Sequence, residues 1–418
     1  MPLDLVVIGL GYVGLPLARL AGATGLAVAG YDLSPSVVAQ LNQGRPTTPD
    51  VAPAEVSALL ATGFQATTDP AVIAAADTVV ICVPTGLTSD GSPDPGPLRA
   101  AAETVAARLR PGMLVVLEST SYPGTTDEVL RPILERGSGL RAGEDFHLGF
   151  SPERIDPGNR RYGLRNTPKV VSGHTPLCAK HVAAFYQDLV DTVVIASGTR
   201  EAEMAKLLEN TFRLVNIALV NEVAVFCRQA GIDVWDVLHC AASKPYGFAA
   251  FTPGPGVGGH CIPVDPRYLL SKAESTGFEF SLVNAAFQAN ERMPDYVAER
   301  AADLLADSGG LAGAEVLLLG VTYKPDVPDL RGSPAFAVVE ALRRRGADLS
   351  YHDPHTSRFV VADVPVPREL DLAAALGRAE LTILLQDHRC YQPSRLARAA
   401  RLLFDTRGTV PGGSVAHL

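Results

Sequence analysis

The chain has 418 residues, 47% of them hydrophobic and 19% charged, which is the composition of a folded protein of two or three domains rather than of a mini-protein or a disordered chain. Lys and Arg number 36 and Asp and Glu 45, giving a formal net charge of −9 with neither sign in a long block. This balance argues against nucleic acid or an anionic membrane as the main partner, while leaving room for local basic sites that bind phosphate.

The cysteines give a first indication of compartment and chemistry. They stand at positions 82, 178, 227, 240, 261 and 390, and no two have the C-x-x-C spacing of a zinc ribbon or a redox dithiol. The sequence shows no signal-peptide pattern and no apolar run of about 18 residues, so we expect a cytoplasmic protein with reduced thiols. No metal site is predicted, and one thiol is free to be chemically active.

The first 32 residues have the pattern strand, glycine-rich turn, helix, strand. An apolar strand at 3–8 precedes Gly9-x-Gly11-x-x-Gly14, and Asp32 ends the second strand. Glycines at this spacing let the backbone approach a pyrophosphate at a helix N-terminus, and the acid accepts the ribose hydroxyl and repels a 2′-phosphate. The pattern predicts an NAD site; the alternative is that the glycines only pack the strand against the helix.

Apolar strands recur at 78–83 and 113–117 and alternate with helical stretches such as 97–109, which predicts a parallel, doubly wound sheet. Another short apolar strand precedes Ser151-Pro152-Glu153-Arg154. Glu153 is therefore expected at the carboxyl edge of the sheet, where ligands bind in such folds. A surface ion pair is the alternative interpretation of Glu153.

Residues 201–230 and 281–305 have the apolar spacing of long helices, interrupted only by Pro294. Lys206 and Asn210 are four positions apart and share one helix face, which suits either a substrate site or solvated polar groups. The Gly/Pro-rich stretch 244–266 between these helices is predicted to be a functional loop.

Cys261 lies in that predicted loop, four residues before Asp265. A thiol in a rigid, partly polar loop suits a nucleophile, and a buried structural cysteine is the equally open alternative. Burial is the favoured interpretation for the four cysteines that fall in predicted strands or helices, Cys82, Cys178, Cys227 and Cys240.

A strand–helix–strand rhythm returns at 315–320, 333–345 and 348–353. Its first turn, which starts at Gly320 and contains Tyr323 and Lys324, lacks the G-x-G-x-x-G pattern, so a phosphate ligand other than a dinucleotide is predicted. His352-Asp353-Pro354-His355 is interpreted as a strand-end turn without a metal.

Several blocks in this order resemble the UDP-glucose/GDP-mannose dehydrogenase family over essentially the whole chain, most closely its UDP-N-acetylhexosamine 6-dehydrogenase branch. They are residues 9–18 (GLGYVGLPLA), 83–85 (VPT), 117–125 (LESTSYPGT), 151–159 (SPERIDPGN), 166–171 (NTPKVV), 203–210 (EMAKLLEN), 253–266 (PGPGVGGHCIPVDP) and 323–326 (YKPD). The resemblance implies an α/β fold in which two Rossmann-like doubly wound domains are joined by a central long-helix dimerisation domain. The implied boundaries are 1–198 for the NAD-binding domain, 199–305 for the central domain with the cysteine loop, and 306–418 for the UDP-sugar-binding domain.

The resemblance also implies a four-electron oxidation of the C6 alcohol of a UDP-sugar to a carboxylate, as in polysaccharide biosynthesis, with two NAD molecules used in succession. Cys261 would form a thiohemiacetal and then a thioester. Lys206 would stabilise the oxyanion, Asn210 and Asp265 would position substrate and water, and Glu153 would assist hydrolysis.

Binding residues carry over in the same way. Cofactor contacts are implied for the glycine-rich turn, for two strand ends and for one cation: Gly9, Gly11, Tyr12, Val13, Gly14, Asp32, Val83, Pro84, Thr85, Glu118, Ser119, Thr120 and Arg331. Substrate contacts are implied for Glu153, Arg154, Lys206, Asn210, Lys244, Gly256, Gly258, Tyr323, Lys324 and Arg407. A homodimer or higher oligomer is expected.

Departures from the family pattern affect the choice of sugar. Pro157 and Thr252 stand where UDP-glucose-specific relatives tend to have Glu and Lys, and with residues 244–248 (KPYGF) they favour an N-acetylated sugar over UDP-glucose. UDP-N-acetylglucosamine is the first choice because residues 151–159 and 244–248 resemble the N-acetylglucosamine oxidases more than the N-acetylmannosamine oxidases, with UDP-glucose or UDP-N-acetylmannosamine as alternatives. A further departure, Gly332 in place of a common acidic residue, does not bear on the sugar.

Two other functions are weighed against this one. A 3-hydroxyacid or 6-phosphogluconate-type dehydrogenase shares the N-terminal fold but needs neither the cysteine nor a third domain. A nucleotide-sugar-binding protein without turnover is disfavoured by the complete set of implied catalytic residues.

Overall fold

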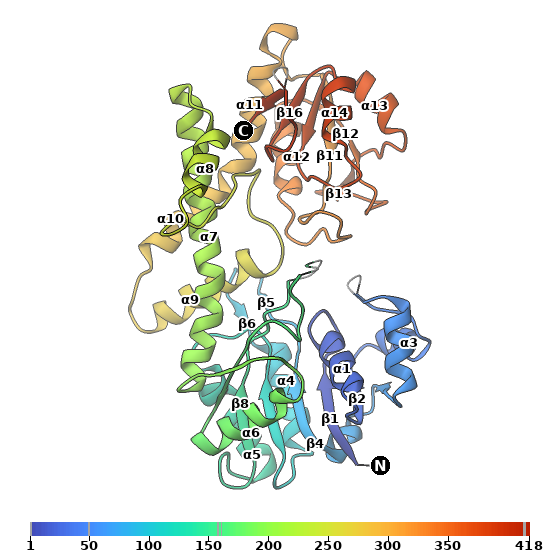
Figure 1. The fold of residues 1–418 in the computed structure, drawn as a ribbon, viewed down its shortest axis with the longest axis vertical. Helices are drawn as coiled ribbons and strands as arrows, with labels where there is room; N and C mark the ends of the chain where they lie inside the picture. Colours follow the sequence, from blue (N-terminus) through green and yellow to red (C-terminus); the bar gives the residue numbers. More distant parts are fainter. Residues whose placement is uncertain (1, 49–50, 157–158, 160, 413–414) are drawn as a thin grey trace. The chain divides into compact units, whose positions relative to one another are not determined.

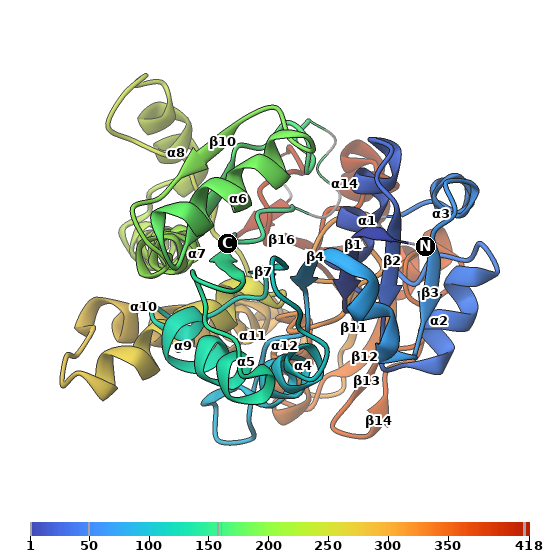
Figure 2. The ribbon, with the colours of Figure 1, turned by 90° about the horizontal axis from the view of Figure 1, so that it is seen from below.

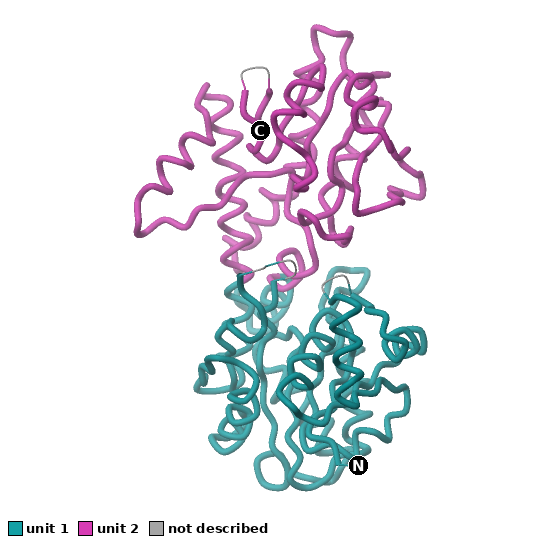
Figure 3. The backbone as a smooth tube through the Cα atoms, turned by 45° about the vertical axis from the view of Figure 1, so that its right-hand side comes forward, with its two compact units in different colours: residues 1–209, 267–278 teal, residues 210–266, 279–418 magenta. Residues whose placement is uncertain are grey.

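The structure is a computed structural model that describes residues 2–48, 51–156, 159, 161–412 and 415–418. The chain divides into two compact units, residues 1–209 with 267–278 and residues 210–266 with 279–418 (Figure 3). Helices α7 (Thr199–Ala230) and α9 (Cys261–Ser275) each contribute to both units. The three-domain boundaries implied by the sequence stay predictions.

The first unit contains an eight-stranded sheet of order β10-β9-β8-β7-β4-β1-β2-β3 (Figure 1). Its strands are β1 (Leu3–Ile8), β2 (Val28–Tyr31), β3 (Gln65–Thr67), β4 (Ala76–Ile81), β7 (Leu114–Leu117), β8 (His147–Phe150), β9 (Lys169–Gly173) and β10 (Val193–Ile195). All neighbouring strands run parallel except β8 and β9. Among the described residues between those two strands, none forms a helix, and without a helical crossover the chain returns antiparallel.

Helices cover both faces of this sheet. Val7 faces a core with α1 (Gly14–Ala23) and α6 (Pro176–Gln187), whereas its neighbour Val6 faces α4 (Gly96–Ala106) on the other side (Figure 2). Burial on both faces explains why the strands are continuously apolar. The remaining elements of the unit are α2 (Pro35–Asn42), α3 (Pro53–Ala61), α5 (Arg131–Ser138), the 3-10 helix η1 (Pro70–Ala75), the π-helix η2 (Thr125–Leu130) and the short strands β5 (Gly86–Leu87) and β6 (Pro93–Asp94).

The helical part of the second unit confirms one predicted helix and corrects the other. Helix α7 matches the predicted helix at 201–230, but the predicted helix at 281–305 is two helices, α10 (Ser281–Glu291) and α11 (Met293–Leu304). The break falls at Arg292 because Pro294 has no N–H to donate and so favours the first turn of a new helix. Helix α8 (Val234–Ala242) precedes the Gly/Pro-rich stretch.

The second unit ends in a five-stranded, all-parallel sheet of order β12-β11-β15-β16-β17. One face packs on α11 and α12 and the other on α13 and α14. The bounds are β11 (Glu315–Leu319), β12 (Asp348–His352), β15 (Leu381–Leu384), β16 (Leu403–Asp405), β17 (Val415–His417), α12 (Ala335–Arg344), α13 (Leu372–Arg378), α14 (Pro393–Ala399), η3 (Ala306–Ser308) and the hairpin β13 (Val360–Val361) with β14 (Val364–Pro365).

The fold class predicted from the sequence is confirmed: a Rossmann-type sheet, a set of long helices and a second parallel sheet follow one another along the chain. Among the described residues, no helix combines the length and the apolar character needed to cross a membrane.

Candidate active site

The turn between β1 and α1 has the geometry of a dinucleotide site. Gly9 has a φ of +88°, and a Cβ added there would lie 2.6 Å from the Cys82 carbonyl oxygen; a Cβ on Gly14 would lie 1.9 Å from the Gly9 carbonyl oxygen. A Cβ on Gly11 would meet no protein atom within 4 Å. Two glycines are therefore required by the fold itself, while the space beside Gly11 is open for a ligand to approach the backbone. Tyr12 and Val13 complete the turn and are half-buried.

Asp32 follows β2 and lies beside this turn, to which it is hydrogen-bonded. Its Oδ2 accepts the Leu10 N–H at 2.9 Å and its Oδ1 accepts the Ser34 N–H at 2.9 Å. The carboxylate is half-buried and sits where a ribose hydroxyl is bound in Rossmann folds. These groups, together with the open side of Gly11, fit NAD.

Two further strand ends lie at the same carboxyl edge of the sheet. Val83-Pro84-Thr85 follows β4, and Ser119-Thr120 follows β7, the parallel neighbour of β4. The Ser119 Oγ donates to the Val83 carbonyl oxygen at 2.8 Å, which ties the two ends together. The structure thus brings these predicted cofactor residues to one edge.

Glu118, at the same strand end, has its side chain turned into the protein interior. Its side chain is 1% exposed and pairs with the Lys169 Nζ, and the Tyr186 hydroxyl also donates to it. Burial, with the charge of Glu118 beside it, raises the pKa of the Cys82 thiol well above its usual value. The Glu118 side chain is thus an internal ion-pair partner, and a cofactor contact at this position stays a prediction.

The stretch after β8 carries Glu153 and Arg154. Glu153 is half-buried, and one of its carboxylate oxygens accepts the Ile155 N–H. Arg154 is held by two groups, with its Nη2 2.5 Å from the Glu209 Oε1 and its Nη1 donating to the Pro168 carbonyl oxygen at 2.7 Å. Pro157, which bears on the sugar, lies outside the described residues.

Helices α7 and α9 carry the four other predicted catalytic groups. Lys206 and Asn210 are one turn apart on α7 and only 6% and 5% exposed, so the interpretation as solvated polar groups is wrong. Asp265, 1% exposed, accepts the Asn210 Nδ2–H at its Oδ2 over 2.5 Å. This bond joins α7 to α9 one turn after Cys261.

Cys261 was predicted to lie in a loop, and that prediction is wrong. It is the first residue of α9, and it is exposed. The dense prolines around it suggested a loop; Pro263 falls in the first turn, where no intrahelical bond is lost, and Pro266 is tolerated inside the helix. An exposed thiol at a helix N-terminus is better placed for reaction than a loop thiol, because the helix dipole favours negative charge there.

The other cysteines follow the prediction with two corrections. Cys178 and Cys227 are buried within helices, as expected. Cys82 is buried too but lies just after β4 rather than inside it, with its N–H bonded to the Ile8 carbonyl oxygen. Cys240 is exposed on α8, so its predicted burial is wrong.

In the second unit, the two predicted substrate glycines both pack against Pro334, and Gly258 also packs against Tyr323. A Cβ on Gly258 would lie 2.9 Å from the Tyr323 Cβ, and a Cβ on Gly256, which has a φ of +133°, would lie 3.1 Å from the Pro334 Cβ. The nearby Gly332, which departs from the family pattern, has a φ of +57°, and a Cβ there would lie 2.8 Å from the Gly259 carbonyl oxygen. These glycines let the stretch before α9 lie directly on the turn that carries Tyr323 and Lys324.

Three predicted cations also lie in this unit. The Arg331 Nη2 is 2.6 Å from the Asp329 Oδ2, and the Arg407 Nε donates to the Leu385 carbonyl oxygen at 2.7 Å. A Cβ on Gly254 would lie 3.0 Å from the Arg407 Nη1, so this arginine adjoins the glycine stretch. Lys244, in an exposed turn after α8, lies over the Tyr246 ring.

The turn after β11 repeats the geometry of the first turn, but the acid beside it is fully buried. Gly320 has a φ of +74°, and a Cβ there would lie 2.4 Å from the Gln386 carbonyl oxygen. The Asp353 Oδ2 accepts the Val321 N–H at 2.7 Å and also bonds the His388 Nε2 at 3.0 Å, both side chains being fully buried. Burial opposes ionisation of Asp353, but the hydrogen bond from His388 holds its pKa below the usual value.

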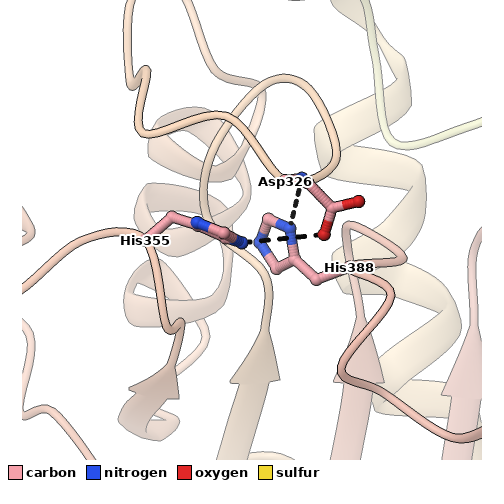
Figure 4. Close-up of side chains that lie close together, drawn as sticks. All are labelled: Asp326, His355 and His388. Carbon is pink, nitrogen blue, oxygen red and sulfur yellow. Dashed lines mark hydrogen bonds and ion pairs between the residues drawn. The ribbon is translucent and has the colours of Figure 1, made fainter. Parts of the chain in front are cut away.

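His355 ends the predicted strand-end turn and lies close to His388 and Asp326 (Figure 4). The three groups offer ligand atoms within 4.8 Å of one another, so His355 has the partners that the sequence did not reveal. Both nitrogens of His388 are engaged, however: Nδ1 accepts the Asp326 N–H at 2.9 Å and Nε2 bonds Asp353. A metal bound to His388 would leave either the Asp326 N–H or the Asp353 carboxylate without this hydrogen-bond partner, so the three side chains do not fit a metal site.

Sequence reasoning missed two buried titratable groups near the site. Lys169 lies beneath the stretch that carries Glu153, and Glu203 accepts hydrogen bonds from the turn that follows Ser119 and Thr120. Glu203 lies within a block that carries the family resemblance, and its position one turn before Lys206 was the available signal.

Comparison with known proteins identifies the family. Its models match residues 3–190 as the NAD-binding domain, 200–292 as the central domain and 317–412 as the UDP-binding domain of UDP-glucose/GDP-mannose dehydrogenases. A UDP-N-acetyl-D-glucosamine 6-dehydrogenase of Pseudomonas aeruginosa is 39% identical over 85% of this chain and 83% of its own.

A UDP-N-acetyl-D-mannosamine dehydrogenase of Salmonella typhi is 33% identical over 91% and 93% of the two chains. The solved structure of a UDP-D-ManNAc dehydrogenase from Pyrococcus horikoshii superposes with a TM-score of 0.89 at 32% identity, covering 99% and 98%. The chain therefore belongs to the UDP-glucose/GDP-mannose dehydrogenase family and is an NAD-dependent nucleotide-sugar dehydrogenase.

Proposed function

We propose that the protein oxidises the C6 hydroxyl of UDP-N-acetylglucosamine to a carboxylate. The chain groups with the UDP-N-acetylhexosamine branch of the family, and the reaction is a UDP-sugar 6-dehydrogenation. The observation that carries the proposal is the Asn210–Asp265 bond, which ties the helix bearing Lys206 to the helix that begins at Cys261.

In the proposed mechanism, NAD held at the glycine turn would supply the hydride acceptor for each of the two oxidations at C6. The Cys261 thiolate attacks the aldehyde carbon formed first, and the carbonyl oxygen takes up a proton, giving a thiohemiacetal. Its oxidation gives a thioester. Water then adds to the thioester carbon, the carbon–sulfur bond breaks, and the thiolate leaves, so that one alcohol and one water yield one carboxylate.

The other side chains have separate roles in the proposal. The Lys206 ammonium stabilises the oxygen at C6 as it becomes negative. Asn210 and Asp265, each held by the other, position the substrate and the attacking water. Glu153 takes the proton from that water during hydrolysis.

Binding is divided between the two sheets in the proposal. The Gly9–Gly14 turn, with Tyr12, Val13 and Asp32, would hold the cofactor, and the strand ends would contact its nicotinamide end. The strand-end residues are Val83, Pro84, Thr85, Ser119 and Thr120. UDP and the sugar are held by Gly256, Gly258, Tyr323, Lys324 and Arg407, with Arg154 and Lys244 as further contacts and Arg331 as a cation for the cofactor's pyrophosphate.

The most specific part of the proposal is the identity of the sugar. Pro157 and Thr252 disfavour UDP-glucose, and the P. aeruginosa relative named for UDP-N-acetyl-D-glucosamine supports the N-acetylglucosamine form. The relatives named for N-acetylmannosamine keep that sugar as the second candidate.

The test is the number of NADH molecules formed per sugar consumed, measured with UDP-N-acetylglucosamine, UDP-N-acetylmannosamine, UDP-N-acetylgalactosamine and UDP-glucose. Two per UDP-N-acetylglucosamine supports the whole proposal. Two with another sugar alone rejects the specificity but keeps the mechanism, and one per sugar rejects the thioester route.

We also propose that the protein is a homodimer built on α7, in the cytoplasm. Phe212, Leu219 and Phe226 recur every seven residues on α7, and their side chains are 49%, 56% and 61% exposed. A seven-residue repeat forms one stripe along a helix, and a stripe of large apolar side chains is the pattern of a helix–helix interface. Light scattering tests this. The wild type is expected to have the mass of a dimer, and Phe226→Glu the mass of a monomer.

A further inference from the structure

The segment that follows β7 is held by the first turns of α7. Glu203, fully buried on α7, accepts the Gly124 N–H at its Oε2 over 2.6 Å. Its Oε1 accepts the Thr126 N–H at 2.8 Å and the Thr126 hydroxyl at 2.7 Å. One carboxylate thus takes three donors from this segment, and the first of them, Gly124, lies four residues after Thr120.

Neighbouring contacts reinforce the same attachment. The Thr199 hydroxyl, at the start of α7, donates to the Asp127 Oδ2, and the Arg200 Nη2 lies 2.9 Å from the Glu128 Oε1. On α9, the Lys272 Nζ lies 2.8 Å from the Glu128 Oε2. Unlike Glu203, the Glu128 pairs are partly exposed, so they contribute less to holding the segment.

We propose that Glu203 is a positioning residue that fixes the Ser119–Gly124 turn relative to Lys206. Glu203 and Lys206 are three positions apart on α7, so they share a helix face. The inference rests on the proposed function, in which Ser119 and Thr120 hold the nicotinamide end of the cofactor and Lys206 holds the C6 oxygen. Hydride transfer requires these two ends to be aligned closely, and small displacements lower the rate steeply.

A purely structural role is the competing explanation. Gly124 precedes η2, and the Gly124 and Thr126 N–H groups have no intrahelical partner there, so a buried acceptor is needed in any case. A structural role predicts lower stability and a smaller active fraction. A positioning role also predicts a change in cofactor affinity and in the chemical step of the molecules that fold.

Glu203→Gln distinguishes the two roles. Above about pH 7, where Glu203 is ionised and the variants are to be compared, an amide replaces one acceptor oxygen by a donor, which then meets the N–H of Gly124 or the donors of Thr126. Glu201→Gln is the matched control, because Glu201 is an exposed acid in the same turn of α7. Thr126→Val, which removes only one hydroxyl donor, is the milder variant should Glu203→Gln fail to fold.

Three quantities are measured on each variant: the Kd for NAD, the Kd for UDP, and the deuterium isotope effect on kcat with substrate labelled at C6. Glu203→Gln is expected to raise the Kd for NAD about tenfold, to leave the Kd for UDP unchanged and to increase the isotope effect. Glu201→Gln should match the wild type.

Wild-type values for the NAD Kd and the isotope effect in folded Glu203→Gln would overturn the proposal and leave a structural role only. Failure of the proposed function is a separate result: the wild type would then form no NADH with any UDP-sugar. In that case an unchanged NAD Kd in Glu203→Gln still rejects the positioning role, and a raised one still supports it.

Discussion

Lys169 and Glu118 form an ion pair inside the first unit, with 2.7 Å between the Lys169 Nζ and the Glu118 Oε1 and only 3% and 1% of their side chains exposed. The same Nζ donates to the Pro152 carbonyl oxygen at 3.2 Å, immediately before Glu153. The pair therefore connects the end of β7 with the stretch that carries the proposed base.

Breaking this pair from one side should be costly. Lys169→Met leaves the Glu118 carboxylate buried without its counter-charge, and we expect a loss of about 3–5 kcal/mol in the free energy of unfolding. Urea denaturation measures it. The double variant Lys169→Met/Glu118→Gln should recover part of that loss, and equal losses in the single and double variants would contradict the argument.

Replacing the proposed nucleophile should separate the two oxidations. Cys261→Ser is expected to lower the rate of acid formation by at least about 10³-fold, because an alkoxide leaves less readily than a thiolate. Product analysis by mass spectrometry gives the rate. Cys240→Ser is the control, since Cys240 is also exposed but lies on α8, and wild-type acid formation by Cys261→Ser would reject the covalent route.

Glu203 should make stability depend on pH. Burial raises its pKa to about 7, against the hydrogen bonds from Thr126 and Gly124. Between pH 4.5 and 7 the unfolded chain ionises this group while the folded chain keeps it protonated, so its contribution to stability is present at low pH and is lost as pH rises. The loss is about 3 kcal/mol.

This slope is measured as the difference between wild type and Glu203→Gln in the free energy of unfolding from pH 4.5 to pH 7.5. Taking the difference removes the effect of all other titrating groups. Glu201→Gln should retain the wild-type slope, and parallel curves for wild type and Glu203→Gln would show that Glu203 ionises normally.

Two glycines of the first turn should respond differently to an added side chain. Gly14→Ala places a Cβ 1.9 Å from the Gly9 carbonyl oxygen and is expected to prevent folding or lower the Tm strongly. Gly11→Val meets no protein atom at its Cβ, so we expect a normal Tm without cofactor and the loss of the stabilisation that NAD gives. Thermal unfolding with and without NAD tests both, and NAD stabilisation of Gly11→Val at the wild-type level would contradict the placement.

Local patterns predicted much of this molecule. The strand, glycine turn, helix and acid of residues 3–32 were recognisable because hydrophobic period and glycine spacing act over short distances. Helix α7 was recognisable for the same reason, and so was the shared face of Lys206 and Asn210.

Contacts between distant segments were not predictable in this way. Three such contacts join different elements, and no local hydrophobic period encodes them. They are the Lys169–Glu118 pair, the hydrogen bonds to Glu203, and the buried His388–Asp353 bond. The start of α9 at Cys261 was hidden by its prolines, whose usual effect is to end helices rather than to lie within them.

The two glycine turns differ in what their acids can reach. Gly9 and Gly320 each follow the first strand of a sheet with a positive φ, and in each case the next N–H bonds the acid that follows the second strand, Asp32 or Asp353. Asp32 is half-buried, whereas Asp353 is fully buried against His388. The first turn therefore keeps a carboxylate for a ligand hydroxyl, and the UDP-binding domain has to hold its nucleotide with groups other than the corresponding acid.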